Sequence, residues 1–533
     1  MSGGEIVSDR LGLDVNLLYS SFMTYAFNFL GSVFSAFFFA ILTRALTIEE
    51  YGVFVMILRY VGYFSIPSVI FTYWLPRDIS RGRNTSKTGL LYSMGVGLLV
   101  TPLYLVFALG ISGELGQPLF PILLSSAIIV LEYVYAALSY ASQGHKPQFV
   151  GFGQFAFKAG QAITGIAMVS GLSLGLTGAV LSFLFGRLIM DLVLLRLNLP
   201  LLRKSKLSAG TAILWAKSSW RSLLGSLTCL IFWLDVLVVS LVFGSEVPVA
   251  FYGVSMMILM AVTYASSIPS SLYPKVLAKK NLEDLGEAIW LTLLITVPIA
   301  SFIVLYAEPI CAILGTKYLP AAWPLRAFLA ASVMQTVSGI AVISYLGLEG
   351  KDSPSISQKE LIKSAVFKND LVNLSVNAAY ILMVFLASYL LDDPVAVSVA
   401  WGASMLASFT ISLFLSAKLL KRDFGQLFPF RTLADQASRI ILPAFPLALL
   451  PFAFPISRLD TLWVLVPLLA VHIVLYFSGY IALLYLISPK FRSTLEEVRR
   501  GIGSAVGGLF GQRGSWAPDS GKAGGNPVPP PPQ

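Results

Sequence analysis

The sequence predicts an all-α protein that crosses a membrane about fourteen times. Of its 533 residues, 56% are hydrophobic and only 12% are charged, about half the charged fraction of a soluble domain. Apolar segments long enough to cross ~30 Å of hydrocarbon follow one another along the chain, and part of the sequence occurs twice. We therefore expect two pseudo-symmetric lobes of six helices each, followed by two C-terminal helices.

Fourteen segments have the required length and composition. Each is expected to be a helix, because lipid offers no hydrogen-bond partner to an open backbone. They lie at residues 17–43, 51–76, 88–112, 119–141, 154–171, 173–197, 222–243, 250–273, 288–308, 323–348, 370–391, 394–417, 439–456 and 460–487.

The turns between these segments alternate in charge. One set (112–118, 172, 244–249 and 391–394) is short and nearly free of Lys and Arg, and the cations on that side are Arg44, Lys317 and Arg458. The other set is basic, and its longest member runs from Arg196 to Arg221. By the positive-inside rule the basic turns are cytoplasmic. The pattern predicts a multi-pass protein of the cell (cytoplasmic) membrane with both termini inside.

The duplicated unit lies inside two of the predicted helices. YGVFVMILRYVGYFSIP runs from Tyr51 to Pro67, and YGVSMMILMAVTYASSIP runs from Tyr252 to Pro269. The copies lie in the second and eighth predicted helices, an offset of six, so both enter the membrane in the same sense and form a parallel repeat. Duplicated membrane chains are typical of transporters, in which two similar lobes move around a site between them.

The repeat and the basic turns also suggest domain limits. We expect an N-terminal lobe over 1–205, a C-terminal lobe over 206–425, the surplus pair of helices over 426–488 and a cytoplasmic tail over 489–533. The tail is rich in glycine and ends in four prolines before Gln533, a composition that cannot bury a core and predicts disorder.

Composition argues against several functional classes. The net charge of +10 is explained by the basic turns, so no nucleic-acid partner is expected. Cys229 and Cys311 suggest neither a metal site nor a disulfide framework. No GxxxxGK[ST] loop is present, so direct use of ATP is not expected, nor is any cofactor. The predicted outer loops are too short for a membrane glycosyltransferase, and the chain is not expected to be an enzyme.

Charged residues in the middle turns of predicted helices are the candidate site. A charge at the bilayer centre costs about 2.5–3.5 kcal/mol even on the gentler scale, so such a residue should face a partner or a wet cavity. Arg59, Glu132, Arg187 and Asp235 lie deep, and Lys158 lies nearer to a helix end. An anionic substrate group held by the first-lobe cations, with Asp235 balancing them in the empty state, is our hypothesis.

Several of these residues also have a purely structural interpretation. Arg187 and Asp191 are four residues apart and can pair on one helix face. Lys158 and Arg326 are close enough to helix ends to extend to the interface. Glu132 is either a hydrogen-bonded core carboxyl or a proton carrier. Arg59 cannot lose its proton and lies too deep to reach the interface.

Two further patterns remain open, and His472 is expected to be neutral and packed. Polar side chains share one face of the predicted helices at 154–171 and 370–391, which fits either a cavity lining or hydrogen bonds between helices. These side chains are Gln154, Lys158, Gln161, Asn373, Asn377 and Tyr380.

The segment from Leu42 to Gly52 (LTRALTIEEYG) resembles the opening of the polysaccharide-transporter family, the O-antigen (Wzx-like) flippases. Asp235, followed by Phe243-Gly244-Ser245-Glu246 and Phe251-Tyr252-Gly253, resembles the second-lobe counterpart. The turn Gly175-Leu176-Thr177-Gly178-Ala179 and the turns at 144–146 and 350–351 are also similar to this family. The resemblance covers nearly the whole chain.

This resemblance implies a V-shaped fold of the multidrug/oligosaccharidyl-lipid/polysaccharide exporter superfamily. It implies that the chain moves a polyprenyl-linked oligosaccharide across the membrane, with membrane lipid, H⁺ or Na⁺ and glycan-assembly proteins as partners. In such proteins the first two helices of each lobe line the cavity, which would place Arg59 and Asp235 on it. The alternative is an ion-coupled multidrug or metabolite antiporter of the same fold, with Glu132 or Asp235 as the ion site.

Overall fold

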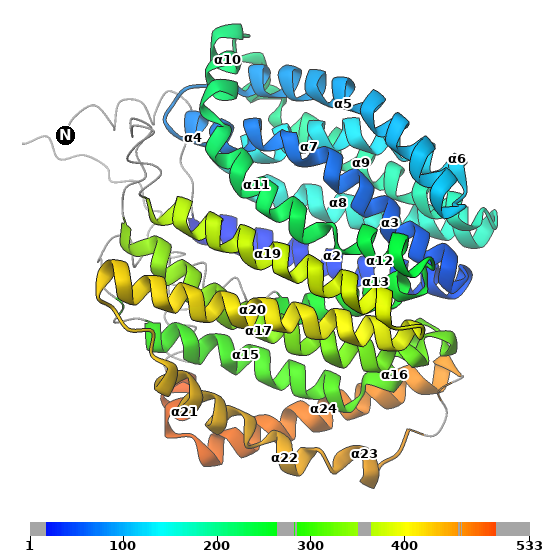
Figure 1. Ribbon diagram of the computed structural model, residues 1–533, viewed down its shortest axis with the longest axis vertical. Helices are drawn as coiled ribbons and strands as arrows, with labels where there is room; N and C mark the ends of the chain where they lie inside the picture. The colour runs from blue at the N-terminus through cyan, green and yellow to red at the C-terminus, as the bar shows by residue number, and fades with distance from the viewer. Residues whose placement is uncertain are drawn as a thin grey trace, which may run out of the picture.

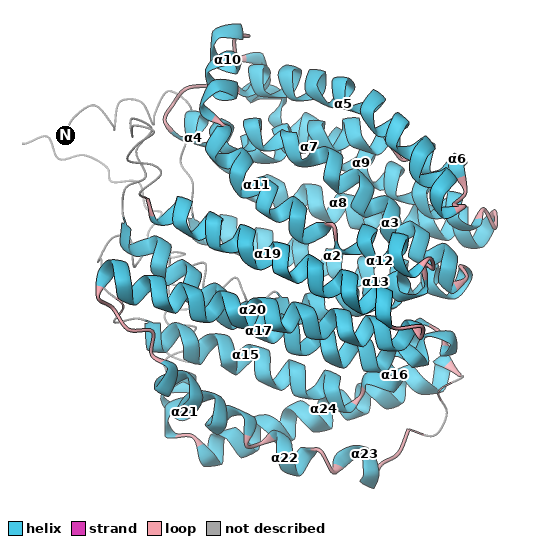
Figure 2. Ribbon diagram, viewed as in Figure 1, coloured by secondary structure: helices cyan, strands magenta, loops and turns pink. Residues whose placement is uncertain are grey.

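The computed structural model describes residues 17–263, 282, 285–349, 364–456, 459 and 461–496. Helices joined by short loops make up this part of the chain (Figure 2). Eleven of the described helical segments are long and apolar enough to cross a membrane. The predicted class, an all-α polytopic membrane protein, is confirmed.

Roughly parallel helices lie one above the other in Figure 1, with the C-terminal helices at the bottom of the view. The helices up to Trp233 are α2 (Leu17–Ala45), α3 (Ile48–Ser65), η1 (Ile66–Ser68), α4 (Val69–Ser80), α5 (Ser86–Leu115), α6 (Leu119–Leu124), α7 (Ser126–His145), α8 (Gln148–Gly165), η2 (Ile166–Gly171), α9 (Gly175–Arg203), α10 (Ala209–Ser218) and α11 (Trp220–Trp233). The remaining helices are α12 (Asp235–Phe243), α13 (Val247–Thr263), α15 (Leu285–Leu305), α16 (Ala307–Leu314), η4 (Thr316–Ala321), α17 (Ala322–Glu349), α19 (Ala365–Leu390), α20 (Pro394–Phe424), α21 (Phe430–Ile441), α22 (Ala444–Leu447), α23 (Leu450–Ala453) and α24 (Leu462–Ile487).

The structure confirms the all-α membrane class but not the predicted number of fourteen spans. Three predicted helices, at 17–43, 154–171 and 250–273, correspond to α2, α8 with η2, and α13, which are not among the eleven long apolar segments. The count of fourteen therefore stays a prediction. Other predicted features lie outside the described residues, namely Pro269 at the end of the second repeat, the basic loop at 275–280, the turn at 350–351, Arg458 and the tail from 497 on.

Several predicted helices are not continuous. The segment predicted at 439–456 is divided into the end of α21, then α22 and α23, because Pro443, Pro446 and Pro451 each lack the N–H that a helix needs. The helix predicted at 51–76 begins at Ile48 and passes through a short 3-10 turn around Pro67. The helix predicted at 222–243 is broken at Leu234, where no proline or glycine marks the break.

The basic stretch between the predicted lobes contains a helix that the sequence did not indicate. α10 is fixed to the first lobe, since the Trp215 Nε1–H donates to the Asp78 carboxylate at 3.0 Å. The Ser208 N–H donates to Thr88 Oγ1 at 3.0 Å on the same side. The predicted domain boundary at 205/206 thus falls just before a helix that is bound to the N-terminal lobe.

The start of α3 follows directly from the sequence. Thr47 Oγ1 accepts the Glu50 N–H at 3.1 Å, and the Glu50 carboxylate accepts the Thr47 N–H at 2.9 Å. This reciprocal capping box satisfies two backbone donors that a helix start leaves free. It fixes the point at which the first repeat enters the bundle.

Candidate functional site

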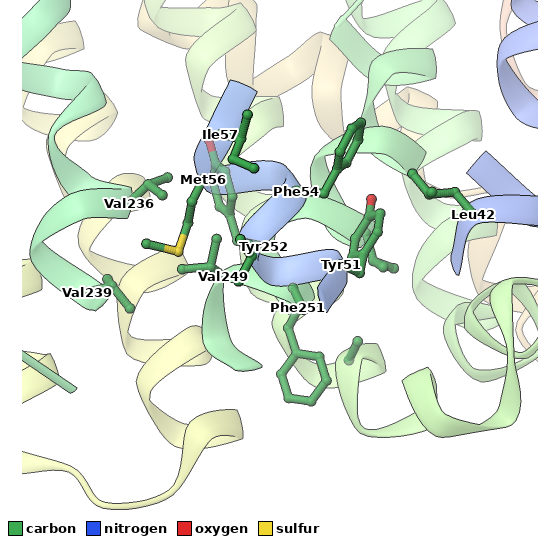
Figure 3. Close-up of a cluster of buried hydrophobic side chains, with 14 of the residues drawn as sticks. Leu42, Tyr51, Phe54, Met56, Ile57, Val236, Val239, Val249, Phe251 and Tyr252 are labelled. Atoms are coloured by element: carbon green, nitrogen blue, oxygen red, sulfur yellow. The ribbon is translucent and has the colours of Figure 1, made fainter. Parts of the chain in front are cut away.

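The two repeated helices, α3 and α13, cross at their Tyr-Gly pairs. A Cβ on Gly52 would collide with the backbone oxygen of Glu246, and a Cβ on Gly253 would collide with the Val55 side chain. Each copy of the repeat therefore uses its glycine to bring the other lobe close. Figure 3 shows the apolar side chains around this crossing, where Met56 of α3 lies near Val236 of α12.

Arg59 lies about two turns beyond the crossing on α3 and faces the second lobe. Its guanidinium donates a hydrogen bond to the Tyr252 hydroxyl. The guanidinium carbon lies 5.4 Å from the Tyr252 ring centroid and 5.5 Å from that of Trp233, within cation–π range. Arg59 is partly exposed, so an aromatic frame holds a cation that is still accessible.

Asp235 begins α12, at the break after α11, and is completely buried. One carboxylate oxygen accepts the Val236 N–H at 2.8 Å. The other accepts the Tyr380 hydroxyl at 2.8 Å and the Trp401 Nε1–H at 3.3 Å. A helix N-terminus also favours negative charge. Asp235 is thus well supplied with donors and is closed off by aromatic side chains.

Stacked rings connect the cation to the carboxylate. The Tyr252 and Trp401 rings are nearly parallel, with centroids 4.4 Å apart and an interplanar angle of 7°. We call Arg59, Tyr63, Trp233, Asp235, Tyr252, Tyr380 and Trp401 the lobe-interface cluster. In the described part of the chain, none of the ion pairs includes Arg59 or Asp235.

The cluster stabilises the break in the predicted helix at 222–243. The Tyr63 hydroxyl donates to the Trp233 backbone oxygen at 2.7 Å, at the last residue of α11. A backbone acceptor that the break leaves free is satisfied in this way. Interrupted membrane helices of this kind commonly form substrate and ion sites, and Asp235 lies directly after the break.

Two of the remaining predicted site residues, Glu132 and Arg187, form a second group with Asp191, which we call the first-lobe cluster. Arg187 forms an ion pair with Glu132 of α7, and rings of Tyr135 and Phe157 lie 4.5 and 5.0 Å from its guanidinium carbon. The predicted pairing of Arg187 with Asp191 is wrong, because Glu132 on the neighbouring helix takes the guanidinium. Asp191 is buried, and neither of its carboxylate oxygens has a hydrogen-bond partner among the described residues.

The other polar residues singled out in the sequence have structural partners. The Lys158 ammonium is 3.4 Å from Ser32 Oγ on α2, and Arg326 pairs with Glu308 at 2.8 Å. Extension to the membrane interface is the structural interpretation that the sequence suggests for both residues. The Asn377 amide donates to the Thr228 backbone oxygen at 2.8 Å. The buried His472 lies between the backbone oxygens of Leu468 and Phe454, at 2.7 and 2.9 Å.

A set of contacts joins the lobes at the end of the bundle away from the basic turns. Arg44, at the end of α2, donates to the backbone oxygens of Ile313 and Ala312, at 2.9 and 3.2 Å, at the C-terminal end of α16. In return, Lys317 donates to the backbone oxygen of Leu46. Cations at helix C-termini are electrostatically favourable. The two lobes thus cap each other's helix ends, and we call these contacts the reciprocal clasp.

The sequence did not indicate Tyr252, Trp233 or Trp401 as members of a site. Aromatic residues in apolar helices ordinarily pack or face lipid, and nothing in their spacing distinguishes these three. One usable signal was present: Tyr252 opens the second copy of the repeat, and Tyr51 opens the first. In the described residues, no group of three or more His, Cys, Asp or Glu side chains is placed to hold a metal ion.

Comparison with known proteins finds similar solved structures but no matching family model or curated protein. No protein-family model matches the chain, and no curated protein matches it. Among solved structures it is similar to the lipid II flippase MurJ in an inward closed conformation, with a TM-score of 0.62, 13% identity, and 88% of this chain and 99% of that chain covered.

Two transporters of the MATE family are also similar. An inward-facing structure of a multidrug resistance transporter of the MOP superfamily gives a TM-score of 0.57 at 12% identity, with 73% of this chain and 96% of that chain covered. A mutant of the Vibrio cholerae transporter VcmN gives 0.52 at 12% identity, with 79% and 98% covered. The chain therefore has the fold that MurJ and MATE transporters share.

Proposed function

We propose that the chain is a flippase that moves a polyprenyl-(pyro)phosphate-linked oligosaccharide across the membrane by alternating access. The observation that carries the proposal is Arg59, a permanently charged side chain between the two lobes that has no ion-pair partner among the described residues. The likeness of the fold to that of a lipid II flippase supports it.

Arg59 has the chemistry that a phosphate-linked headgroup requires. A guanidinium presents five N–H donors and binds phosphate oxygens in pairs, and here one donor reaches Tyr252 while the side chain stays partly exposed. The partly exposed Trp233 ring beside it is a surface on which a sugar ring can pack. Asp235, closed off behind Trp401 and Tyr380, stays near the cation without blocking it.

Crossing the bilayer is the step that needs a protein. A sugar-phosphate headgroup cannot enter hydrocarbon, because its charge and hydroxyl groups would lose their hydrogen bonds to water. A polar site between two lobes removes this barrier while the lipid tail stays in the bilayer. The coupling ion, H⁺ or Na⁺, and partner proteins of glycan assembly belong to this proposal as well.

The test is flipping of a fluorescent polyprenyl-linked oligosaccharide in proteoliposomes. We expect Arg59→Ala to slow flipping roughly tenfold to a hundredfold, since a charged hydrogen bond contributes about 1.5–3 kcal/mol. Met260→Ala is the matched control, because the repeat places Met260 where α3 has Arg59. Both variants are checked for folding by size-exclusion chromatography.

Flipping that Arg59→Ala leaves unchanged would keep the substrate class and remove Arg59 from the site. Absence of flipping for every lipid-linked saccharide tested would overturn the function itself.

An ion-coupled antiporter is the second candidate, and Asp191 is the observation that favours it. A buried carboxyl without a hydrogen-bond partner among the described residues is an acidic group that can bind an ion. Efflux of a cationic dye under an imposed pH or Na⁺ gradient tests this function. Loss of efflux in Asp191→Asn, but not in the exposed control Glu114→Gln, would support it.

A further inference from the structure

A concave basic surface lies at the end of α9, away from both clusters. Its volume is about 520 Å³, and Arg196, Leu199, Pro200, Arg203 and Lys204 line it. Three cations and two apolar residues therefore line an open hollow on one side of the helix end, and the hollow is large enough for a small-molecule headgroup.

None of the three cations is neutralised by the described part of the protein. Arg196, Arg203 and Lys204 are exposed, and none of them takes part in the ion pairs found among the described residues. Three like charges around one concavity repel each other. An anion in the space would relieve this repulsion and would find guanidinium groups suited to phosphate oxygens.

The length of α9 places these cations at the membrane surface. The helix runs from Gly175 to Arg203, and about 20 helical residues cross the hydrocarbon core. Counted from Gly175, the hydrocarbon ends near residue 195. Arg196, Arg203 and Lys204 then lie at the level of the lipid headgroups.

The helix face below the cations is apolar and exposed. Leu188, Leu192 and Leu195 are 38%, 56% and 37% exposed. Leu188, Leu192, Arg196 and Leu199 follow one another at intervals of three or four residues, so they share one face of the helix. The apolar part of this face is suited to acyl chains, and the basic part is suited to the phosphate above them.

We propose that this end of α9 binds an anionic phospholipid of the surrounding bilayer, with its phosphate between Arg196, Arg203 and Lys204 and its acyl chains along the leucine face. The site is separate from the lobe-interface cluster and does not depend on the transported substrate. It gives the first lobe a fixed lipid contact at the end of the bundle that bears the basic turns.

Titration of the purified full-length protein with cardiolipin, followed by native mass spectrometry, tests the site. We expect the triple variant Arg196→Gln, Arg203→Gln and Lys204→Gln to weaken cardiolipin binding roughly tenfold or more, since each cation near an anionic lipid contributes about 1 kcal/mol. The control triple Lys418→Gln, Lys421→Gln and Arg431→Gln removes the same charge from exposed cations of the second lobe, which do not line the concave surface, and should change binding by less than about twofold.

A second variant separates a lipid from a soluble anion. Leu192→Asn keeps all three charges and should weaken cardiolipin binding several-fold by removing acyl-chain contact. Inorganic pyrophosphate that competes with cardiolipin at low concentration, together with no effect of Leu192→Asn, would overturn the proposal in favour of a soluble anion. Equal losses in the two triple variants would overturn it in favour of general electrostatic attraction.

The site is also distinguishable from the transport path. Flipping of the lipid-linked oligosaccharide is measured in vesicles of phosphatidylcholine alone. There we expect the Arg196/Arg203/Lys204 variant to flip at the wild-type rate. Loss of flipping in those vesicles with cardiolipin binding intact would assign the cations to the transported molecule and overturn the proposal.

Discussion

The two copies of the repeat, α3 and α13, have the same packing residues but different polar ones. The register that aligns Tyr51 with Tyr252 also aligns Gly52 with Gly253, and both glycines lie at the helix crossing. The same register aligns Arg59, which faces the other lobe, with Met260, which is 41% exposed. The two copies therefore share the glycine contact that joins the lobes, whereas only the first copy has a charged residue, Arg59, at the position that Met260 takes in the second.

The residues before each copy differ in a complementary way. Arg44, before α3, reaches backbone oxygens of the second lobe. Glu246, before α13, accepts the Gln117 amide of the first lobe at 3.2 Å. The charged residue that contacts the other lobe just before the repeat is therefore a cation in the first lobe and an acid in the second. The two copies of the repeat thus share their packing residues but differ in the charged residues around them.

The largest expected effect comes from the crossing itself. Gly52→Ala places a Cβ against the backbone of Glu246, which cannot move aside, and should cost about 3 kcal/mol or more. Gly253→Ala meets the Val55 side chain instead and should cost about 1–2 kcal/mol. Thermal unfolding in detergent measures both.

Gly62→Ala is the control for these substitutions, because its Cβ would lie at an ordinary 3.7 Å from Trp233. The double variant Gly253→Ala, Val55→Ala should recover part of the loss. Equal destabilisation by Gly52→Ala and Gly253→Ala would show that the two contacts are equivalent.

The next effect comes from the two repeated tyrosines. Tyr252→Phe removes the hydroxyl that holds the Arg59 guanidinium and should slow flipping roughly tenfold, the effect of losing one hydrogen bond to a charged group. Tyr51→Phe changes the same position in the other copy, where the ring packs edge-on against Tyr318, and should leave the rate nearly unchanged. The proteoliposome assay compares them, and equal rates for the two variants would contradict the proposed role of Tyr252.

A smaller effect is expected from the reciprocal clasp. Arg44→Ala removes the donor to two backbone oxygens of α16 and should favour separation of the lobes at this end by about 1 kcal/mol, several-fold in population. Distances between spin labels on the two lobes report this shift. Arg439→Ala, whose partner Asp435 is on the same helix, is the control, and a distance distribution unchanged by Arg44→Ala would show that the clasp does not hold the lobes.

The smallest effect concerns the helix starts. Thr47→Ala removes the capping box of α3 and should lower stability by about 1 kcal/mol. Ser245, before α13, has a weaker contact, its hydroxyl accepting the Val247 N–H at 3.3 Å. Ser245→Ala should therefore cost less than Thr47→Ala, and the opposite order of thermal midpoints would refute this comparison.

Length and hydropathy were sufficient to predict the fold class, because a membrane-spanning helix needs a long apolar run and little else. The break at Leu234 could not be predicted, since the segment has no proline or glycine there and its interruption is stabilised by Tyr63 from another helix. The segment predicted at 439–456 belongs to one of the eleven long apolar helical segments, but it is interrupted for the opposite reason. Its composition is apolar, but its prolines outweigh hydropathy in deciding where the helix ends.

The charged residues of the candidate site could be predicted from the sequence, but the aromatic residues that contact them could not. Arg59 and Asp235 stand out because charge is costly inside a membrane, and the structure places both in one cluster. Tyr252 and Trp401, which connect them, look like ordinary apolar-helix residues in the sequence. Arg187 shows the limit of local reasoning, since Asp191 is its neighbour on the helix and Glu132, on another helix, is its partner.

The crossing at Gly52 lies much closer to one end of the α3–α4 segment than to the other. Gly52 lies four residues from the start of α3, about 6 Å along the helix, whereas Ser80 at the end of α4 lies about 42 Å away at 1.5 Å per residue. A rotation of about 5° at Gly52 would move the near end by roughly 0.5 Å and the far end by roughly 3.7 Å. If the lobes rotate about the glycine contact with α3 and α4 moving as one body, a small displacement at the clasp would be accompanied by a displacement about seven times larger at the basic end.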